Sequence, residues 1–171
     1  MNGSPRAHQL VELRARVRFD ADGSALDREW SWITPDAGWL VYDHDGRGTI
    51  TSALQLFGSV TFWMVWSNGY EALSALDNNQ DGQLAGDELK GLAIWHDANA
   101  NGVSERGEVR RLAEWGIVAL STRYRAEDES DVYIAESPDG VTFIDGTIRP
   151  TYDVLLHRLS EGRRSNAKGA M

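Results

Sequence analysis

Cysteine does not occur anywhere in this chain of 171 residues. Its absence excludes disulfide bonds, thiolate zinc sites and cysteine nucleophiles, and it leaves the cellular compartment open. Long apolar runs are absent as well. The most apolar segment, residues 56–66, is much shorter than the ~20 residues that a helical membrane span requires. Residues 1–16 lack the apolar stretch of a signal peptide. We therefore expect neither a membrane span nor an N-terminal signal peptide.

Positive charge is scarce relative to negative charge. The chain has 17 Lys and Arg residues against 26 Asp and Glu, which gives a net charge of −9 and a pI near 4.8. An acidic surface repels phosphate backbones, so we expect no nucleic-acid partner. The same charge suits a cation-binding protein, although many acidic proteins bind no cation. The 7 Trp residues predict a well-buried aromatic core.

The hydrophobic pattern predicts a hairpin at the start of the chain and helices in the middle. Apolar residues alternate with Arg over residues 13–19, which is typical of a half-buried strand, and residues 28–33 fit the returning strand. Residues 54–76 favour one or two helices. Residues 89–96 and 109–115 favour two further short helices, each with apolar positions on one face.

After Gly116 the residue pattern changes from helical to β-forming. Two turn signals, at residues 137–140 and 145–146, separate segments rich in β-forming residues. The β-rich segments are residues 116–124, 131–135, 140–144 and 152–156. The prediction is one α+β domain over residues 1–159, with a helical middle between an N-terminal hairpin and a C-terminal antiparallel segment. Residues 160–171 are polar and weakly basic, and we expect a disordered tail there.

Residues 77–88 carry oxygen-bearing side chains at the spacing of a calcium loop. Calcium takes about six to eight oxygen ligands, and loops of the EF-hand type supply them from positions 1, 3, 5, 7, 9 and 12. Gly82 occupies position 6, where the backbone turns with positive φ. Position 9 is Ala85, so a water ligand would be needed there. The expected ligands are Asp77, Asn79, Asp81, the carbonyl of Gln83, and Glu88.

A second loop, residues 97–108, follows closely with the same spacing. Gly102 stands at position 6, and Ser104 occupies position 8, where an apolar residue is usual. The expected ligands are Asp97, Asn99, Asn101, the carbonyl of Val103, Glu105 and Glu108. Loops rich in Asx and Gly also form turns and cap helices without metal. Two matching loops in succession favour metal binding over turns alone.

Two bound Ca²⁺ ions are the expected cofactors. Calcium is preferred over magnesium because a Glu at position 12 can give two oxygens and because the loop is flexible. Zinc and copper are disfavoured, since the chain has no Cys and its 4 His residues are scattered.

Residues 43–55 look like a third, damaged copy of the loop. Its degenerate ligand set is Asp43, Asp45 and Gln55. Arg47 places a positive charge at position 5, and Gln55 is a neutral donor just after position 12, so we expect a structural turn and no third ion.

Only residues 89–96 separate the two intact loops. A single short helix would have to serve both, which places the two ions at its opposite ends and prevents the usual face-to-face pairing. The upstream loop then becomes the partner of the first loop. We expect Ile50 and Leu84 to form a short backbone bridge between them.

The words NGYEAL, LDNNQDGQ, WHDANANGVS and AEWGIVAL occur in this order within residues 38–120. In sequence and spacing this region resembles the EF-hand-like calcium-binding region of large secreted bacterial proteins of the hemolysin and repeats-in-toxin type. The resemblance implies an EF-hand-like core and a location outside the cell or in its envelope. Arg47 and Gln55 depart from the family pattern, and the chain has no glycine-rich nonapeptide repeats. Some relatives cleave an Asp-Pro bond, and this chain contains no such bond.

The function favoured by these features is calcium binding in which the ions mainly stabilise the fold. The alternative is a calcium-dependent sensor that opens a surface for a protein partner. A metal-dependent enzyme is the least favoured interpretation, and we expect no enzymatic activity. Ligand roles account for the acidic residues, and no Ser/His/Asp set or phosphate loop is present.

Overall fold

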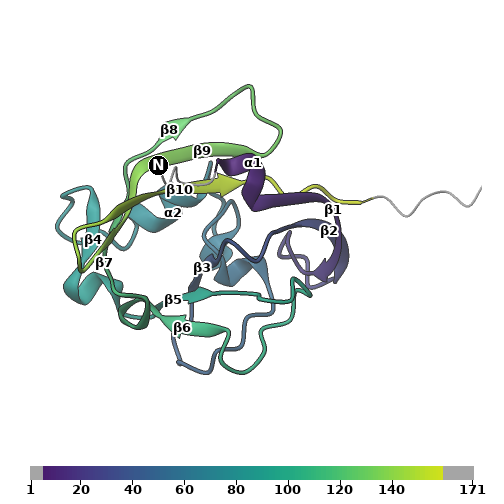
Figure 1. Cartoon of the computed structure of the whole chain (residues 1–171), viewed down its shortest axis with the longest axis horizontal. Helices are drawn as coiled ribbons and strands as arrows, with labels where there is room; N and C mark the ends of the chain where they lie inside the picture. Colours follow the sequence, from purple (N-terminus) through teal and green to yellow (C-terminus); the bar gives the residue numbers. More distant parts are fainter. Residues whose placement is uncertain (1–5, 160–171) are drawn as a thin grey trace, which may run out of the picture.

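The computed structural model describes residues 6–159, and the predicted tail, residues 160–171, lies outside them. The described chain is built mostly from β-strands, which form a two-stranded hairpin, a five-stranded sheet and a three-stranded sheet. Its two α-helices have only 4 and 6 residues. Figure 1 shows the five-stranded sheet along the top and left of the molecule, the three-stranded sheet below it and the hairpin on the right. The expected α+β class with a helical middle is therefore wrong.

The N-terminal hairpin forms where the alternating pattern predicts it. Helix α1 (Ala7–Leu10) leads into β1 (Val11–Phe19), which pairs antiparallel with β2 (Arg28–Ile33). The apolar side chains of Val17 and Phe19 are buried, while Arg18 between them is exposed.

The three-stranded sheet replaces the short helices that the sequence suggested after the first loop. Its strands are β3 (Trp39–Tyr42), β5 (Leu92–Trp95) and β6 (Val109–Arg111), and β5 lies in the middle. The helix predicted over residues 89–96 is therefore wrong. An isolated helix of that length is unstable, whereas β5 gains backbone partners on both edges.

Between the strands the chain forms short helical turns in place of the long helices predicted over residues 54–76. Only α2 (Gly69–Ser74) is an α-helix, and the Asn68 side chain caps it by accepting from the backbone N–H groups of Tyr70 and Glu71. The remaining turns are 3₁₀-helices: η1 (Ala53–Gln55), η2 (Thr61–Trp63), η3 (Gly86–Leu89) and η4 (Leu112–Trp115). Gly116 ends the last of these, with a φ of 70°.

The five-stranded sheet contains most of the C-terminal part of the chain. Along the main path the strand order is β10-β9-β7-β4, and β8 pairs with β9. These strands are β4 (Gln83–Ala85), β7 (Ile117–Ser121), β8 (Arg125–Ala126), β9 (Tyr133–Phe143) and β10 (Ile148–Val154).

The predicted turn at residues 137–140 lies inside β9, so that prediction is wrong. Gly140 is needed there for another reason: a Cβ on it would lie 2.3 Å from Thr151 Oγ1 on the neighbouring strand. The pairing register also shifts between Arg149 and Thr151, opposite this point. The second turn signal is confirmed, because Gly146 has a φ of 82° and joins β9 to β10.

The core consists of two clusters. One gathers the hairpin, β3 and β5 around Trp32 and Trp95, which are both 0% exposed, and Phe19 packs against both indole rings. This arrangement confirms the predicted aromatic core. The second cluster joins α2, β4, β7 and η4 through leucines and Ile117. Residues 6–159 contain no helix long and apolar enough to cross a membrane.

Candidate metal-binding loops

Three loops with the predicted spacing occur in the structure, but their flanking elements are not those of an EF-hand. The first loop (residues 77–88) follows α2 and contains β4 and the start of η3. The second loop (residues 97–108) connects β5 to β6. The upstream loop (residues 43–55) follows β3 and contains η1. Since none of the three lies between two α-helices, the helix-loop-helix arrangement implied by the resemblance is wrong.

The three loops nevertheless share one backbone conformation. In each of them, positions 4 and 6 both have positive φ. Position 6 is always Gly. Position 4 is Gly only in the upstream loop, so the intact loops hold a side chain there at the cost of local strain. The φ values at positions 4 and 6 are 66° and 68° at Gly46 and Gly48, 58° and 87° at Gln80 and Gly82, and 53° and 73° at Ala100 and Gly102.

In the first loop the carboxylates at positions 1 and 12 close the turn. Asp77 accepts from the backbone N–H groups of Asp81 at 3.2 Å and Gly82 at 2.9 Å. Glu88 reaches back across the loop and accepts from the N–H of Asn78 at 2.8 Å. Two acids that are distant in the loop sequence are thereby held at its two ends.

The second loop repeats these bonds position by position. Asp97 accepts from the N–H groups of Asn101 at 3.1 Å and Gly102 at 2.8 Å, and Glu108 accepts from Ala98 at 3.1 Å. Equivalent residues thus make equivalent contacts in both loops. The shared spacing in the sequence reflects a shared local structure.

Within residues 6–159, tryptophan side chains of the buried core donate hydrogen bonds to ligand carboxylates only in the second loop. The indole N–H of Trp32 donates to Asp97 at 2.8 Å, and that of Trp95 donates to Glu108 at 3.4 Å. The Asp97 residue is only 2% exposed. Its carboxylate therefore has three donors, and residues 6–159 contain no ion pair that involves it.

The remaining ligand candidates line the outer side of each loop. Asn79 and Asp81 are exposed, and the Asn79 amide donates to the Asp81 carboxylate at 3.1 Å. In the second loop Asn99 and Asn101 both donate to Glu105, at 3.0 and 3.3 Å. The two residues expected to contribute carbonyls also lie on the surface: Gln83 starts β4, and Val103 is 56% exposed.

In the upstream loop, the atoms that could bind a cation already form hydrogen bonds or an ion pair within the loop. The Gln55 amide donates to the carbonyl of Thr49 at position 7, at a distance of 2.9 Å. Arg47 forms an exposed ion pair with Asp45 at 3.1 Å. Asp43 accepts from the N–H of Gly48, as position 1 does in the other loops. The Gln55 amide is therefore already hydrogen-bonded to the Thr49 carbonyl, which a cation would need as a ligand.

The expected pairing of the upstream loop with the first loop is wrong. Ile50 contacts the second loop: its N–H donates to Ser104 Oγ at 2.8 Å, and the same hydroxyl donates to its carbonyl at 3.3 Å. Leu84 pairs with Leu120 in the five-stranded sheet. Ser104 at position 8 therefore replaces a backbone bridge with side-chain hydrogen bonds. This explains why a hydroxyl can stand where an apolar residue is usual.

Residues 6–159 contain no group of three or more His, Cys, Asp or Glu side chains arranged to hold a metal ion. The description of these loops as EF-hand metal sites is therefore wrong. The two intact loops still contain only hard oxygen donors, and in each of them the carboxylates at positions 1 and 12 accept hydrogen bonds from the same turn. This chemistry fits Ca²⁺ and does not fit a metal that prefers sulfur or imidazole ligands.

One candidate site was not visible in the sequence. A cavity of about 430 Å³ lies between the two larger sheets, and it is lined by residues of β3, β5, α2, β7, β9 and β10. Asp153 of β10 belongs to this lining, and burial raises the pKa of its carboxyl from 3.8 to about 6. The strand pattern of residues 152–156 predicts that Asp153 lies in a strand but does not show what its side chain contacts.

Comparison with known proteins corrects the family that the sequence motifs suggested. The SPM domain family matches residues 6–157. The chain is also 32% identical over 149 residues to the iron-regulated protein FrpA of Neisseria meningitidis serogroup C. The match covers 83% of this chain and 13% of that protein, so the chain spans only a small part of its relative. The mainly β fold differs from the helical core of an EF-hand, and the chain belongs to the SPM domain family.

Proposed function

We propose that the chain binds Ca²⁺ through the first and second loops and that the ions mainly stabilise the fold. The observation that carries this proposal is the Asp97 carboxylate, buried to 2% exposure with no cationic partner within residues 6–159. The three hydrogen bonds of Asp97 offset part of the cost of burying a charged carboxylate, and a bound cation would offset the rest.

The ligands in the proposal are those of the sequence expectation. Asp77, Asp81 and Glu88 supply the charge of the first loop, and Asp97, Glu105 and Glu108 that of the second. A calcium ion would supply positive charge that draws these carboxylates together. It would replace the contacts in which Asn amides now donate to Asp81 and Glu105.

A calcium titration monitored by calorimetry tests the proposal. A ligand that binds only the folded state stabilises it by RT ln(1 + [L]/Kd), which is about 2.7 kcal/mol at a hundredfold excess over Kd. We expect a higher melting temperature in millimolar calcium than in chelator. Glu88→Gln and Glu108→Gln should each remove part of this rise. Glu129→Gln, in an exposed loop, serves as the matched control.

Two outcomes would count against this function. If calcium produces neither a heat of binding nor a melting shift, the loops are turns that need no metal. If calcium instead exposes new apolar surface to a hydrophobic dye, the sensor alternative with a protein partner is favoured. Terbium emission excited through Trp95 gives an independent readout of the second loop, because this indole donates to Glu108.

A further inference from the structure

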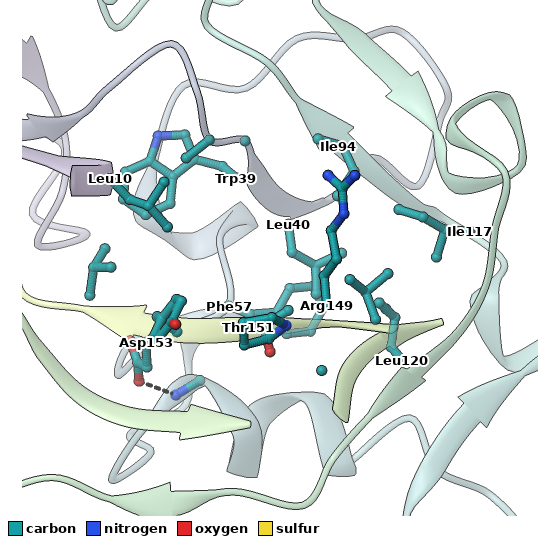
Figure 2. Close-up of a pocket in the computed structure, with 18 of the residues that line it drawn as sticks. Leu10, Trp39, Leu40, Phe57, Ile94, Ile117, Leu120, Arg149, Thr151 and Asp153 are labelled. Carbon is teal, nitrogen blue, oxygen red and sulfur yellow. Dashed lines mark hydrogen bonds between the residues drawn. The ribbon is translucent and has the colours of Figure 1, made fainter. Parts of the chain in front are cut away.

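The cavity between the two larger sheets is separate from the metal-binding loops. Its volume of about 430 Å³ is within the range of small-ligand sites, and no residue of the three loops lines it. Apolar side chains form most of its wall, including Leu10, Trp39, Leu40, Ile94 and Ile117 (Figure 2). An apolar cavity with few charged groups selects ligands by the positions of those groups.

Two charged residues of the lining, Arg149 and Asp153, come from β10, and Asp36 adds a carboxylate from the loop between β2 and β3. Arg149, Thr151 and Asp153 all belong to β10 and all three line the cavity (Figure 2). The two charged residues are four positions apart along β10, a distance of about 13 Å between their Cα atoms at the usual strand rise. Positive and negative groups therefore lie at separate places along the cavity.

Neither Arg149 nor Asp153 has an ion-pair partner within residues 6–159. Asp153 accepts one hydrogen bond, from the backbone N–H of Gly69 at 2.6 Å. Thr151, between them, is already bonded to the Tyr70 hydroxyl at 2.9 Å. The guanidinium of Arg149 lies 5.3 Å from the ring of Phe143, and the residue is exposed. Each charge therefore has capacity left for a ligand group of opposite sign.

We propose that this cavity binds a linear ω-amino carboxylate, such as the side chain and carboxylate of a lysine at a peptide C-terminus. The ammonium binds Asp153 at the buried end, the methylene chain lies against Leu40 and Ile94, and the carboxylate binds Arg149 at the open end. Burial keeps water away from Asp153, which strengthens its attraction for an ammonium. The raised pKa of Asp153 agrees with a carboxyl that lacks a cationic neighbour.

Isothermal titration of the full chain in calcium buffer with ε-aminocaproate, hexylamine and caproate tests the proposal. These probes share the apolar chain and differ only in their charged ends. We expect ε-aminocaproate to bind about tenfold more tightly than either single-charge probe, since one added charge-assisted contact is worth roughly that factor. Equal affinity for all three probes, or no binding of any, would overturn the proposal.

Two variants assign the ends of the ligand. Asp153→Asn should lower the affinity for ε-aminocaproate and leave caproate binding unchanged, whereas Arg149→Gln should lower ε-aminocaproate and leave hexylamine unchanged. Misfolding cannot produce this pattern, because each variant is expected to retain its affinity for one of the two single-charge probes. Asp128→Asn and Arg125→Gln, both on the exposed surface, are the matched charge controls. If both cavity variants bind ε-aminocaproate as the unchanged protein does, the assignment is wrong.

A final comparison separates the two sources of this chemistry. Nα-acetyl-lysine presents a lysine as it occurs at a peptide C-terminus, while ε-aminocaproate represents a free ω-amino acid. Tighter binding of Nα-acetyl-lysine identifies a peptide terminus, and tighter binding of ε-aminocaproate identifies a free small molecule. No residue of the three loops lines the cavity, so a failure of ligand binding here is distinguishable from a failure of the proposed calcium function, which the calcium titration measures by itself.

Discussion

The first and second loops have the same ligand spacing and the same pattern of backbone hydrogen bonds, yet they are embedded differently. Exposed residues at positions 2 to 5 place most of the first loop on the surface, and the exposed Arg123 donates to the carbonyl of Asp81 at 2.9 Å. The second loop is tied to Trp32 and Trp95 in the core. Ligand spacing therefore does not decide how strongly a loop is coupled to the stability of the whole fold.

The largest expected difference concerns the carboxylate at position 1. Asp97→Asn keeps one oxygen for the N–H groups of Trp32 and Gly102 but removes the charge that strengthens both bonds. It also turns an NH2 group toward the N–H of Asn101. Together these losses should cost about 4 kcal/mol. Asp77→Asn should cost less than about 1 kcal/mol, because water reaches the first loop. Urea unfolding in chelator measures both without a contribution from metal. Equal losses in the two variants would show that the core contacts of the second loop contribute little.

Position 6 provides the next comparison. In Gly102→Ala the new Cβ would lie 2.3 Å from Val17 Cγ1 and 3.1 Å from the carbonyl of Arg18. In Gly82→Ala it would meet Arg123 at 2.5 Å, but that side chain is exposed and can move away. Both changes add left-handed strain of about 1 kcal/mol. We expect a total loss of about 3 kcal/mol for Gly102→Ala and about 1 kcal/mol for Gly82→Ala, measured by thermal unfolding.

Asp153 is a second buried carboxylate, but it accepts one hydrogen bond whereas Asp97 accepts three. Its folded-state pKa of about 6 exceeds the ordinary value of 3.8, so the folded state holds this proton more tightly than the unfolded state. Its contribution to stability is therefore fully present below pH ~4 and is lost as the pH rises through 6. Asp153→Asn should stabilise the protein by about 2 kcal/mol at pH 7.5 and by little at pH ~4.

Urea unfolding of Asp153→Asn and the unchanged protein across this pH range provides the measurement. A constant difference between them at all pH values would show that Asp153 does not titrate with a raised pKa, because only a titrating carboxyl produces the change. Asp128→Asn, at an exposed position, should show no such pH dependence and controls for the loss of one charge.

The smallest expected effect is at position 4, where both intact loops hold a side chain at positive φ. Gln80→Gly should stabilise the protein by about 0.5 kcal/mol, because relief of strain exceeds the added entropy of the unfolded chain. Ala100→Gly should give less, since the Ala100 methyl packs against the aromatic core cluster. Calorimetry of both variants tests the order. A larger gain for Ala100→Gly would show that the core contact is unimportant.

Several features followed from local sequence alone. Alternation of apolar residues with Arg predicts β1, and the Asp-Gly pair at residues 145–146 predicts the turn before β10, because both signals depend only on neighbouring residues. The loop spacing likewise predicted the positive φ at Gly82 and Gly102. The hydrogen bonds of each turn join residues within the same twelve positions, and both glycines have positive φ although the two loops are embedded differently.

Other features depended on partners distant in the sequence. Residues 92–95 fit a short helix by periodicity, yet they form β5 because β3 and β6 bind its two edges. The bridge expected between Ile50 and Leu84 failed for a similar reason: Ser104 supplies the bonds to Ile50 through its hydroxyl. Short apolar runs satisfy helix and strand patterns equally, and only tertiary pairing decides between them.

The sequence by itself determined the chemistry of the loops: which oxygens they contain, where glycine permits a left-handed turn, and the absence of sulfur ligands. Tertiary structure alone decided that Asp97 is bonded to Trp32 while Asp77 remains near solvent, and that Arg149 and Asp153 line one cavity. The physical reason is the separation in sequence between the residues that determine each feature. Turn geometry is fixed by bonds between residues a few positions apart, whereas burial and the pairing of charges depend on which distant strands pack together.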